Sequence, residues 1–216
     1  MKLDQIRAAI VDLDGTMVDT QGDFVVALNA MLSELALKSI DRDFVSHTVG
    51  KGSEHLVRRT LAHAGGEASL YAHAMARYQH HYLRINGDHS DVYPGVVEGL
   101  TQLRARGWVL ACLTNKPTPF ALPLLKKKGL DGFFAATFGG DSFERLKPDP
   151  LPLLKTCEAL GHAPAHTLMI GDSSNDARAA RAAGCPVVLV TYGYNHGTPV
   201  RTVDADGFVD RIDQIA

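Results

Sequence analysis

Short, wholly apolar segments that alternate with helical patterns constrain the fold of this chain more than any other feature. Each apolar segment is followed by loop residues and then by a segment with helical periodicity. The strands that we expect are residues 8–13, 108–113, 135–138, 168–170 and 187–191. The helices that we expect between them are residues 95–106, 119–128, 150–160 and 175–183. Because strands without a polar face must be covered on both sides, the pattern predicts an α/β fold with a Rossmann-like, doubly wound parallel sheet.

Residues 17–91 interrupt this alternation. They contain no clear strand, and residues 24–37 and 67–85 have helical patterns. The second helix carries an apolar seam at helical spacing, formed by Tyr71, Met75, Tyr78, Tyr82 and Ile85. We therefore expect an all-helical cap domain at 17–91, inserted into an α/β core made of 1–16 and 92–216.

Composition narrows the classes of function. The chain has 216 residues, of which 45% are apolar and 21% charged, as in an ordinary soluble protein of one or two domains. A formal net charge of −2 gives no basic field for nucleic acid, and no apolar run approaches the ~18 residues of a membrane span. Three widely spaced cysteines favour neither a disulfide framework nor a thiolate metal site. We expect a cytoplasmic monomer or homodimer with no nucleic-acid or membrane partner.

Polar side chains follow the expected strands at the points where the strands end. These residues are Asp12, Asp14, Thr114, Asn115, Lys116, Lys147, Asp172 and Asp176. Ligands of doubly wound sheets bind outside the carboxyl ends of the strands, so we expect these side chains to share one crevice. Four carboxylates can share a small volume only if cations compensate them. Lys147 supplies one positive charge. A divalent metal ion would supply the second, and because the ligands are oxygens, with no cluster of histidine or cysteine, they favour Mg²⁺ over zinc.

The spacing of Asp12 and Asp14 fits catalysis on one reacting group. Residues i and i+2 of a strand point to the same side, so one carboxylate can attack while the other handles a proton. Gly15 lets the backbone turn sharply after them. Taken singly, each motif has a simpler interpretation, since Asp-x-Asp-Gly is a common turn and Asp176 could cap the following helix. All of them in this order, each after a strand, favour a catalytic site.

The stretches "DLDGT", "LTN", "KPDP" and "GDSSND" resemble, in this order, the four motifs of phosphatases of the haloacid dehalogenase superfamily. This resemblance implies that Asp12 is the nucleophile and forms an aspartyl-phosphate, and that Asp14 is the general acid and then the base. It implies that Thr114 and the backbone of Asn115 bind phosphate oxygens and that Lys147 neutralises charge on the nucleophile and the substrate.

The same resemblance implies a site for one Mg²⁺ ion. Its ligands would be Asp12, Asp172 and the main-chain carbonyl of Asp14. Asp176 would be an outer ligand or would orient Lys147.

Further stretches, among them "VYPGV", "TNKP", "GGDSF", "KPDPLPLL" and "TYGYNHG", are similar to the bacterial phosphoglycolate phosphatases within that superfamily. This implies Mg²⁺-dependent hydrolysis of a small phosphorylated metabolite, 2-phosphoglycolate, to glycolate and phosphate. A sugar-phosphate phosphatase or a β-phosphoglucomutase-like enzyme is the alternative. A binding protein that keeps the fold without turnover is disfavoured because Asp12, Asp14, Lys147 and Asp172 are all present.

The cap domain is expected to select the substrate. In "VGKGSEHL", Lys51 stands between two glycines before a predicted helix, where it could bind a substrate carboxylate or be a solvated loop lysine. We expect Tyr192, Tyr194 and His196 to serve loop packing rather than catalysis. The connections near 17–21 and 88–94 are expected to be hinge strands.

Overall fold

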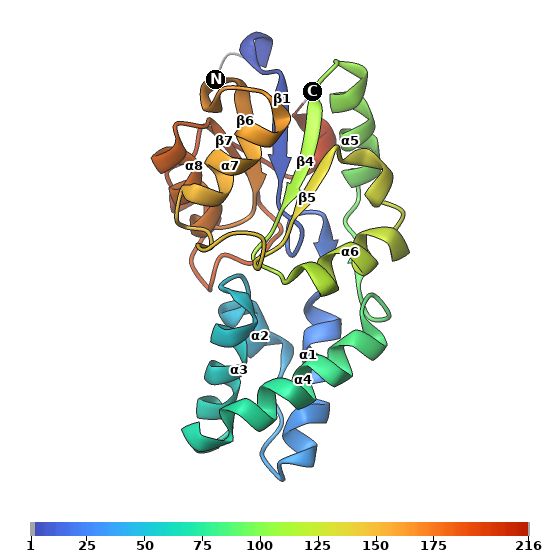
Figure 1. The fold of residues 1–216 in the computed structure, drawn as a ribbon, viewed down its shortest axis with the longest axis vertical. Helices are drawn as coiled ribbons and strands as arrows, with labels where there is room; N and C mark the ends of the chain where they lie inside the picture. Colours follow the sequence, from blue (N-terminus) through green and yellow to red (C-terminus); the bar gives the residue numbers. More distant parts are fainter. Residues whose placement is uncertain (1–2, 216) are drawn as a thin grey trace.

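Six parallel strands form the sheet of the larger domain in the computed structural model, which describes residues 3–215 (Figure 1). The order of the strands is β5-β4-β1-β6-β7-β8. Their bounds are β1 (Ala8–Val11), β4 (Val109–Leu113), β5 (Ala136–Phe138), β6 (Thr167–Gly171), β7 (Val187–Val190) and β8 (Gly207–Val209). The predicted doubly wound sheet is confirmed. The sequence analysis missed the edge strand β8, because only Phe208 and Val209 stand between a glycine and an aspartate.

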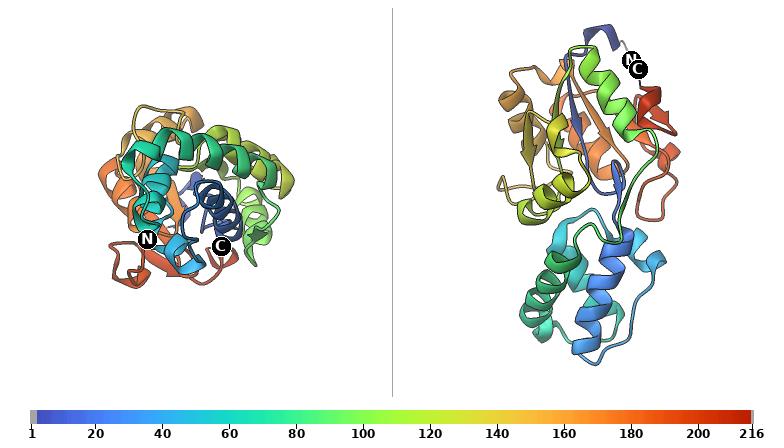
Figure 2. Two further views of the ribbon diagram at one scale, coloured as in Figure 1. Left: turned by 90° about the horizontal axis from the view of Figure 1, so that it is seen from below. Right: turned by 90° about the vertical axis from the view of Figure 1, so that its right-hand side faces the viewer.

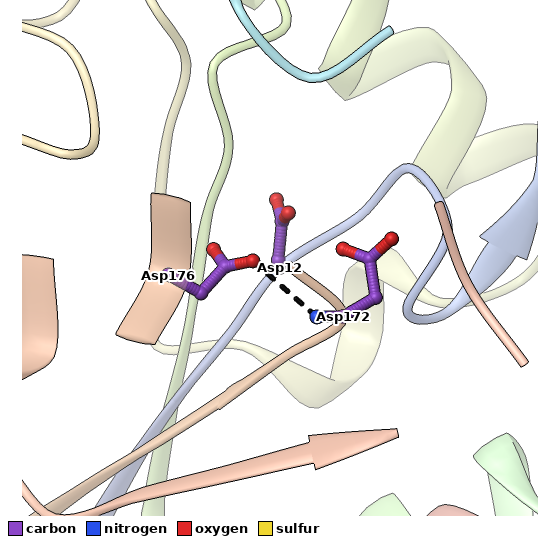
Figure 3. Close-up of side chains that lie close together, drawn as sticks. All are labelled: Asp12, Asp172 and Asp176. Carbon is purple, nitrogen blue, oxygen red and sulfur yellow. Dashed lines mark hydrogen bonds between the residues drawn. The ribbon is translucent and has the colours of Figure 1, made fainter. Parts of the chain in front are cut away.

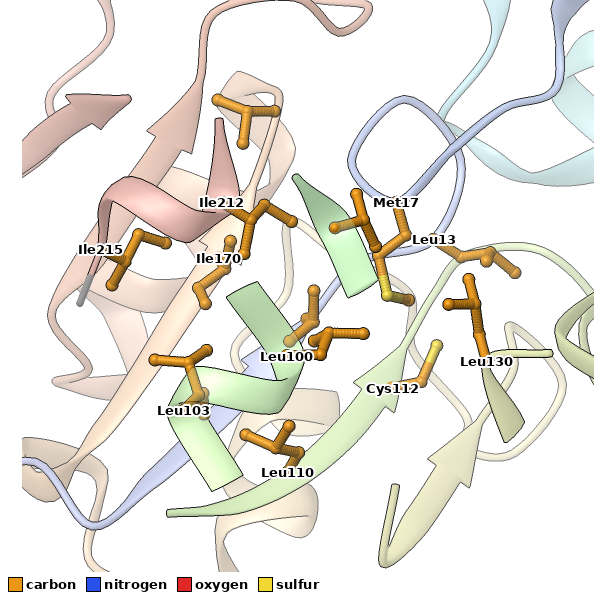
Figure 4. Close-up of a cluster of buried hydrophobic side chains, with 14 of the residues drawn as sticks. Leu13, Met17, Leu100, Leu103, Leu110, Cys112, Leu130, Ile170, Ile212 and Ile215 are labelled. Carbon is orange, nitrogen blue, oxygen red and sulfur yellow. The ribbon is translucent and has the colours of Figure 1, made fainter. Parts of the chain in front are cut away.

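Helices cover both faces of this sheet. They are α5 (Val96–Ala105), α6 (Thr118–Lys127), α7 (Leu151–Leu160) and α8 (Ser174–Ala183). Because alternate strand residues point to opposite faces, Ala9 and Val11 of β1 pack in the cluster that contains α5 and α6, whereas Ile10 packs with α7 and α8. Figure 4 shows part of the first cluster, with Leu100 of α5 and Ile170 of β6. Burial on both faces explains why the four inner strands, β4, β1, β6 and β7, are almost wholly apolar.

Four helices of the described chain form the second domain. They are α1 (Gln21–Glu34), α2 (Arg42–Thr48), α3 (Gly52–His63) and α4 (Tyr71–Ile85). They enclose an apolar cluster of their own, in which Tyr78 and Tyr82 of α4 are fully buried. The seam predicted on α4 therefore does face the interior. The sequence analysis missed α2, because its seven residues make only two turns and show little periodicity.

Two short strands join the domains. β2 (Val18–Asp19) pairs antiparallel with β3 (Asp91–Val92), and Figure 2 shows the two connections running side by side between the sheet and the helices. Both strands lie in the segments predicted as hinges. They correct the expectation that residues 17–91 contain no strand. None of the helices in residues 3–215 is long and apolar enough to cross a membrane.

A buried carboxylate holds the two connections together. Asp23, in the first turn of α1, is inaccessible to solvent and accepts hydrogen bonds from the N–H groups of Gly87 (2.7 Å) and His89 (2.8 Å). The hydroxyl of Ser90 donates a third hydrogen bond to it. The carboxylate therefore satisfies buried donors of the segment that leads into β3, and it fixes the start of α1 against that segment.

Replacing Asp23 tests this contact. We expect Asp23→Asn to lower the free energy of unfolding by about 2 kcal/mol. Hydrogen bonds to a charged acceptor are stronger than those between neutral groups, and the buried donors would lose this acceptor. Urea unfolding followed by circular dichroism measures the change.

Asp88→Asn is the matched control in the same segment. Asp88 is half exposed and pairs with the exposed Lys127, so its replacement should have little effect. Equal losses for the two variants would show that the buried carboxylate does not hold the connection.

Candidate active site

A tight turn after β1 presents two carboxylates at the carboxyl edge of the sheet. The carbonyl of Leu13 accepts hydrogen bonds from three successive N–H groups, those of residues 16–18. Gly15 has φ +82°, and a Cβ at this position would lie 2.3 Å from a carboxylate oxygen of Asp172. Only glycine therefore fits where the turn passes the second acidic loop. The turn leaves Asp12 and Asp14 on the wall of one pocket.

Lys147 lies at the centre of the site. Its ammonium contacts Asp12 Oδ1 at 3.0 Å and Asp176 Oδ1 at 2.7 Å, and it donates to the carbonyl of Leu113 at 3.0 Å. The lysine is 3% exposed. One side chain thus joins the turn after β1, the end of β4 and the first turn of α8, and all three of its N–H donors have acceptors.

Asn115 holds the Lys147 loop in place. Its side-chain amide donates to the carbonyl of Lys147 (2.8 Å) and accepts from the N–H of Lys147 (3.0 Å). The amide also donates to the carbonyl of Gly50 in the cap (2.9 Å). The side chain of Asn115 therefore supports the catalytic loop. Its backbone is the part of the residue that we expect to contact the substrate. Thr114, buried at the end of β4, lines the pocket beside it.

Two further carboxylates follow β6. Asp172 Oδ1 accepts from the Thr16 hydroxyl (3.3 Å), and Asp172 Oδ2 accepts from the N–H of Tyr194 (2.5 Å). Asp176 Oδ2 accepts from the N–H (3.1 Å) and the hydroxyl (2.8 Å) of Ser173, and so caps the start of α8. Its other oxygen contacts Lys147. Asp176 therefore combines the two roles that the sequence left as alternatives, the helix cap and the orientation of the lysine.

Negative charge exceeds positive charge in this cluster. Figure 3 shows Asp12, Asp172 and Asp176 turned toward one another, and each offers an oxygen within 4.8 Å of the others. Burial raises the pKa of Asp12 to about 7 against the attraction of Lys147, and the charge of Asp176 adds to the rise. Burial also raises the pKa of Asp172, helped by Asp176 and Asp12. Burial alone would lower the pKa of Lys147, but Asp12 and Asp176 raise it above its ordinary value.

This excess charge and the oxygen-only donor set fit a hard divalent cation. Asp12 and Asp172 each keep an oxygen that Lys147 does not contact, whereas the second oxygen of Asp176 accepts hydrogen bonds from Ser173. Magnesium uses one or two carboxylates, together with waters and substrate phosphate oxygens. The residues present are therefore able to hold Mg²⁺.

The cap closes the other side of the pocket. Residues of α1, α3, α4 and the loop before α3 line it opposite the carboxylates: Phe24, Val49, Gly50, Gly52, Ser53, Leu56 and Tyr78. Lys51 lies between two of the lining glycines, but its side chain is exposed to solvent. The side chain thus stands at the edge of the pocket and does not line its wall.

Two residues make contacts in the site that the sequence did not predict. Lys116 is buried in the pocket wall, and its ammonium contacts Asp14 Oδ1 at 2.9 Å. Tyr194, expected to serve packing, donates its N–H to Asp172, and its hydroxyl bonds the hinge residues Asp19 (2.6 Å) and Thr20 (2.9 Å). The position of Lys116 directly after Thr114 and Asn115 predicted its place in the crevice but not its contact with Asp14, whereas nothing local in the sequence marks Tyr194.

Comparison with known proteins agrees with this geometry. Residues 9–190 match the family model of the haloacid dehalogenase-like hydrolases. The chain is 45% identical to a phosphoglycolate phosphatase of Thiobacillus denitrificans, over 98% of this chain and 94% of the relative. It is 44% identical to one of Nitrosospira multiformis, over 94% of this chain and 91% of the relative.

Solved structures agree as well. The crystal structure of a predicted phosphoglycolate phosphatase from Haemophilus somnus has a TM-score of 0.94 and 33% identity to this chain, with 98% of this chain and 96% of the other covered. The fold, the cluster of carboxylates around a buried lysine and the match over most of the sequence lead to one assignment. The chain belongs to the haloacid dehalogenase-like hydrolases.

Proposed function

We propose that the protein hydrolyses 2-phosphoglycolate to glycolate and inorganic phosphate, with Asp12 as nucleophile and Mg²⁺ as cofactor. One observation carries the catalytic part of this proposal: the buried Lys147 ammonium holds Asp12 in the wall of a pocket that Asp14 also lines. The names of the relatives support the choice of substrate. The monomeric or homodimeric state and the cytoplasmic location stay predictions.

The first half of the reaction uses the two carboxylates of the turn. An Asp12 oxygen attacks phosphorus while the bond from phosphorus to the ester oxygen breaks. Asp14 gives its proton to the leaving oxygen, so glycolate departs as an alcohol. Lys147 and the backbone beside Thr114 stabilise charge on the phosphoryl oxygens, and phosphoryl transfer depends mainly on such positioning and charge stabilisation.

The second half regenerates the enzyme. Asp14, now ionised, removes a proton from a water molecule, which attacks the phosphorus of the aspartyl-phosphate. The bond between phosphorus and the Asp12 oxygen breaks, and inorganic phosphate leaves. Thr20 supports Asp14 through a hydrogen bond from its hydroxyl (2.8 Å). The same carboxyl thus serves as acid and as base, as the reaction requires.

Asp12, Asp172 and the main-chain carbonyl of Asp14 are the proposed ligands of Mg²⁺. When bound, the ion would offset the repulsion among the carboxylates, keep Asp12 ionised and polarise the phosphoryl group. Asp176 would act indirectly, through its contacts with Lys147 and the start of α8.

Phosphate release across a substrate panel tests the proposed function. The panel contains 2-phosphoglycolate, 3-phosphoglycerate, glucose phosphates and pyridoxal phosphate, each with Mg²⁺ and with a chelator. We expect kcat/KM for 2-phosphoglycolate to exceed the values for the other substrates by about tenfold or more. A site with donors for the substrate carboxylate can achieve such a preference. A preference for hexose phosphates, or a need for a bisphosphate to start turnover, would replace this substrate with the sugar-phosphate alternative.

Conservative variants of the two catalytic carboxylates separate their roles. Asp12→Asn should abolish turnover, because the amide cannot form the aspartyl-phosphate, and circular dichroism should show a folded protein. Asp14→Asn should slow hydrolysis by about 10²–10⁴-fold, the usual contribution of a general acid and base, while Mg²⁺ still binds. Normal turnover by either variant would contradict the role given to that residue.

The raised pKa values predict how Mg²⁺ stabilises the fold at different pH. Asp12 has a pKa of about 7 in the fold, above its ordinary value of 3.8, so without metal its ionisation costs the fold increasing stability as the pH rises from 3.8 to about 7. Mg²⁺ binds the ionised carboxylates and removes this penalty. The rise in Tm on adding MgCl₂ should therefore be larger at pH 8 than at pH 6.

Differential scanning fluorimetry in MgCl₂ and in EDTA measures this rise. Asp172→Asn, which removes a proposed ligand, should lose most of it at both pH values. Glu144→Gln, at an exposed loop carboxylate outside the pocket, is the control and should keep it. An equal rise at pH 6 and pH 8 in the unmodified protein would contradict the linkage.

A further inference from the structure

Lys116 is a buried lysine in the pocket wall that takes part in none of the catalytic steps proposed above. It is 5% exposed, and its ammonium donates to Asp14 Oδ1 at 2.9 Å and to the hydroxyl of Tyr82 at 2.6 Å. The ammonium also lies 4.5 Å from the centre of the Phe24 ring. An ammonium has three N–H donors, and within residues 3–215 these contacts use two. Lys147, in contrast, has an acceptor for each donor.

Tyr78 brings a second unused donor to the same pocket. Its side chain is inaccessible to solvent, and its hydroxyl makes no hydrogen bond to any residue from 3 to 215. Nevertheless it lines the pocket, beside Tyr82, whose ring centre is 5.6 Å away. Burial raises the pKa of Tyr78, and the charge of Asp14 adds to the rise, so the hydroxyl keeps its proton. An unpaired buried hydroxyl is costly, and on a pocket wall it suits an acceptor that arrives with the ligand.

The start of α3 adds backbone donors. Gly52 and Ser53, in its first turn, line the pocket, and the N-cap residue Lys51 makes no side-chain capping bond. The first N–H groups of a helix have no partner within the helix, and they carry the positive end of its dipole. α3 has 12 residues, long enough for this effect.

We propose that Lys116, Tyr78 and the first turn of α3 form the subsite that binds the carboxylate of the substrate. This inference rests on the proposed function and names the residues that would select its substrate. Each of the three groups offers an N–H or O–H donor, in a pocket whose apolar wall includes Phe24 and Leu56, where charge-assisted hydrogen bonds are strong. A sugar hydroxyl carries no charge, so it would neutralise the positive charge of Lys116 less well than a carboxylate.

Lys116 also connects this subsite with catalysis. Its ammonium contacts Asp14, the proposed acid and base, so a carboxylate on its third N–H would lie next to the group that serves the leaving oxygen. In 2-phosphoglycolate a single carbon separates the carboxylate from that oxygen. The arrangement thus suits a short substrate whose two anionic groups lie close together.

Specificity between two esters tests the subsite. The probes are 2-phosphoglycolate and ethyl phosphate, which has the same two-carbon length but no carboxylate. For Tyr78→Phe we expect the ratio of their kcat/KM values to fall about tenfold, the effect of one hydrogen bond to a charged group. The Tm without substrate should be unchanged or higher, because the variant removes only an unpaired hydroxyl. Tyr71→Phe, on the same helix but outside the pocket, is the control and should keep the ratio.

Two lysine variants complete the experiment. Lys116→Met should lower the ratio at least as much as Tyr78→Phe, even if the loss of the Asp14 contact slows both esters. Lys51→Met, at the exposed lysine, should lower it less. An unchanged ratio in both Tyr78→Phe and Lys116→Met would overturn the subsite, and so would a loss confined to Lys51→Met. Failure of the unmodified protein to hydrolyse either ester with Mg²⁺ would instead overturn the proposed function, and the subsite with it.

Discussion

The buried ammonium of Lys147 is the interaction on which the rest of the site depends. It lies between Asp12 and Asp176 and also bonds the carbonyl of Leu113, so it joins the turn after β1, the end of β4 and the first turn of α8. Burying a charge is costly unless it is paired and hydrogen-bonded, and here every donor is satisfied. The carboxylates nevertheless outnumber the ammonium. That imbalance gives the site its affinity for a cation and makes its stability depend on pH.

The support of this lysine extends to the second domain. Asn115 binds both the N–H and the carbonyl of Lys147, and the same amide reaches the carbonyl of Gly50 in the cap. Asn175 of α8 donates to that carbonyl as well (3.1 Å). The loop before α3 is therefore held by the same residues that hold the catalytic loops. This arrangement brings the cap donors into one pocket with the nucleophile, so the group that selects the substrate and the group that attacks it are positioned together.

Much of the fold could be predicted because its signals are local. The strands of the sheet were recognised from their apolar runs, and α4 from a seam that the structure buries at Tyr78 and Tyr82. The elements that were missed give weak local signals. The seven residues of α2 are too few for a clear period, and β8 is a half-buried edge strand of three residues. The hinge strands were expected, but not their antiparallel pairing, because it joins Asp19 with Asp91, 72 positions apart, and no local pattern reveals such a contact.

The sequence alone determined the chemistry that is available: two carboxylates after the first strand, a lysine before a proline and an acidic loop before a helix. These signals follow from the covalent order of the chain, because a parallel sheet brings its strand ends to one edge. Only the tertiary structure decided how each group is used. It bonded the Asn115 side chain to Lys147, placed Lys116 against Asp14, and left the Tyr78 hydroxyl, in the pocket wall, without a hydrogen bond to any residue from 3 to 215. These outcomes depend on contacts between the inserted helices and the sheet, which bring together residues that the sequence keeps far apart.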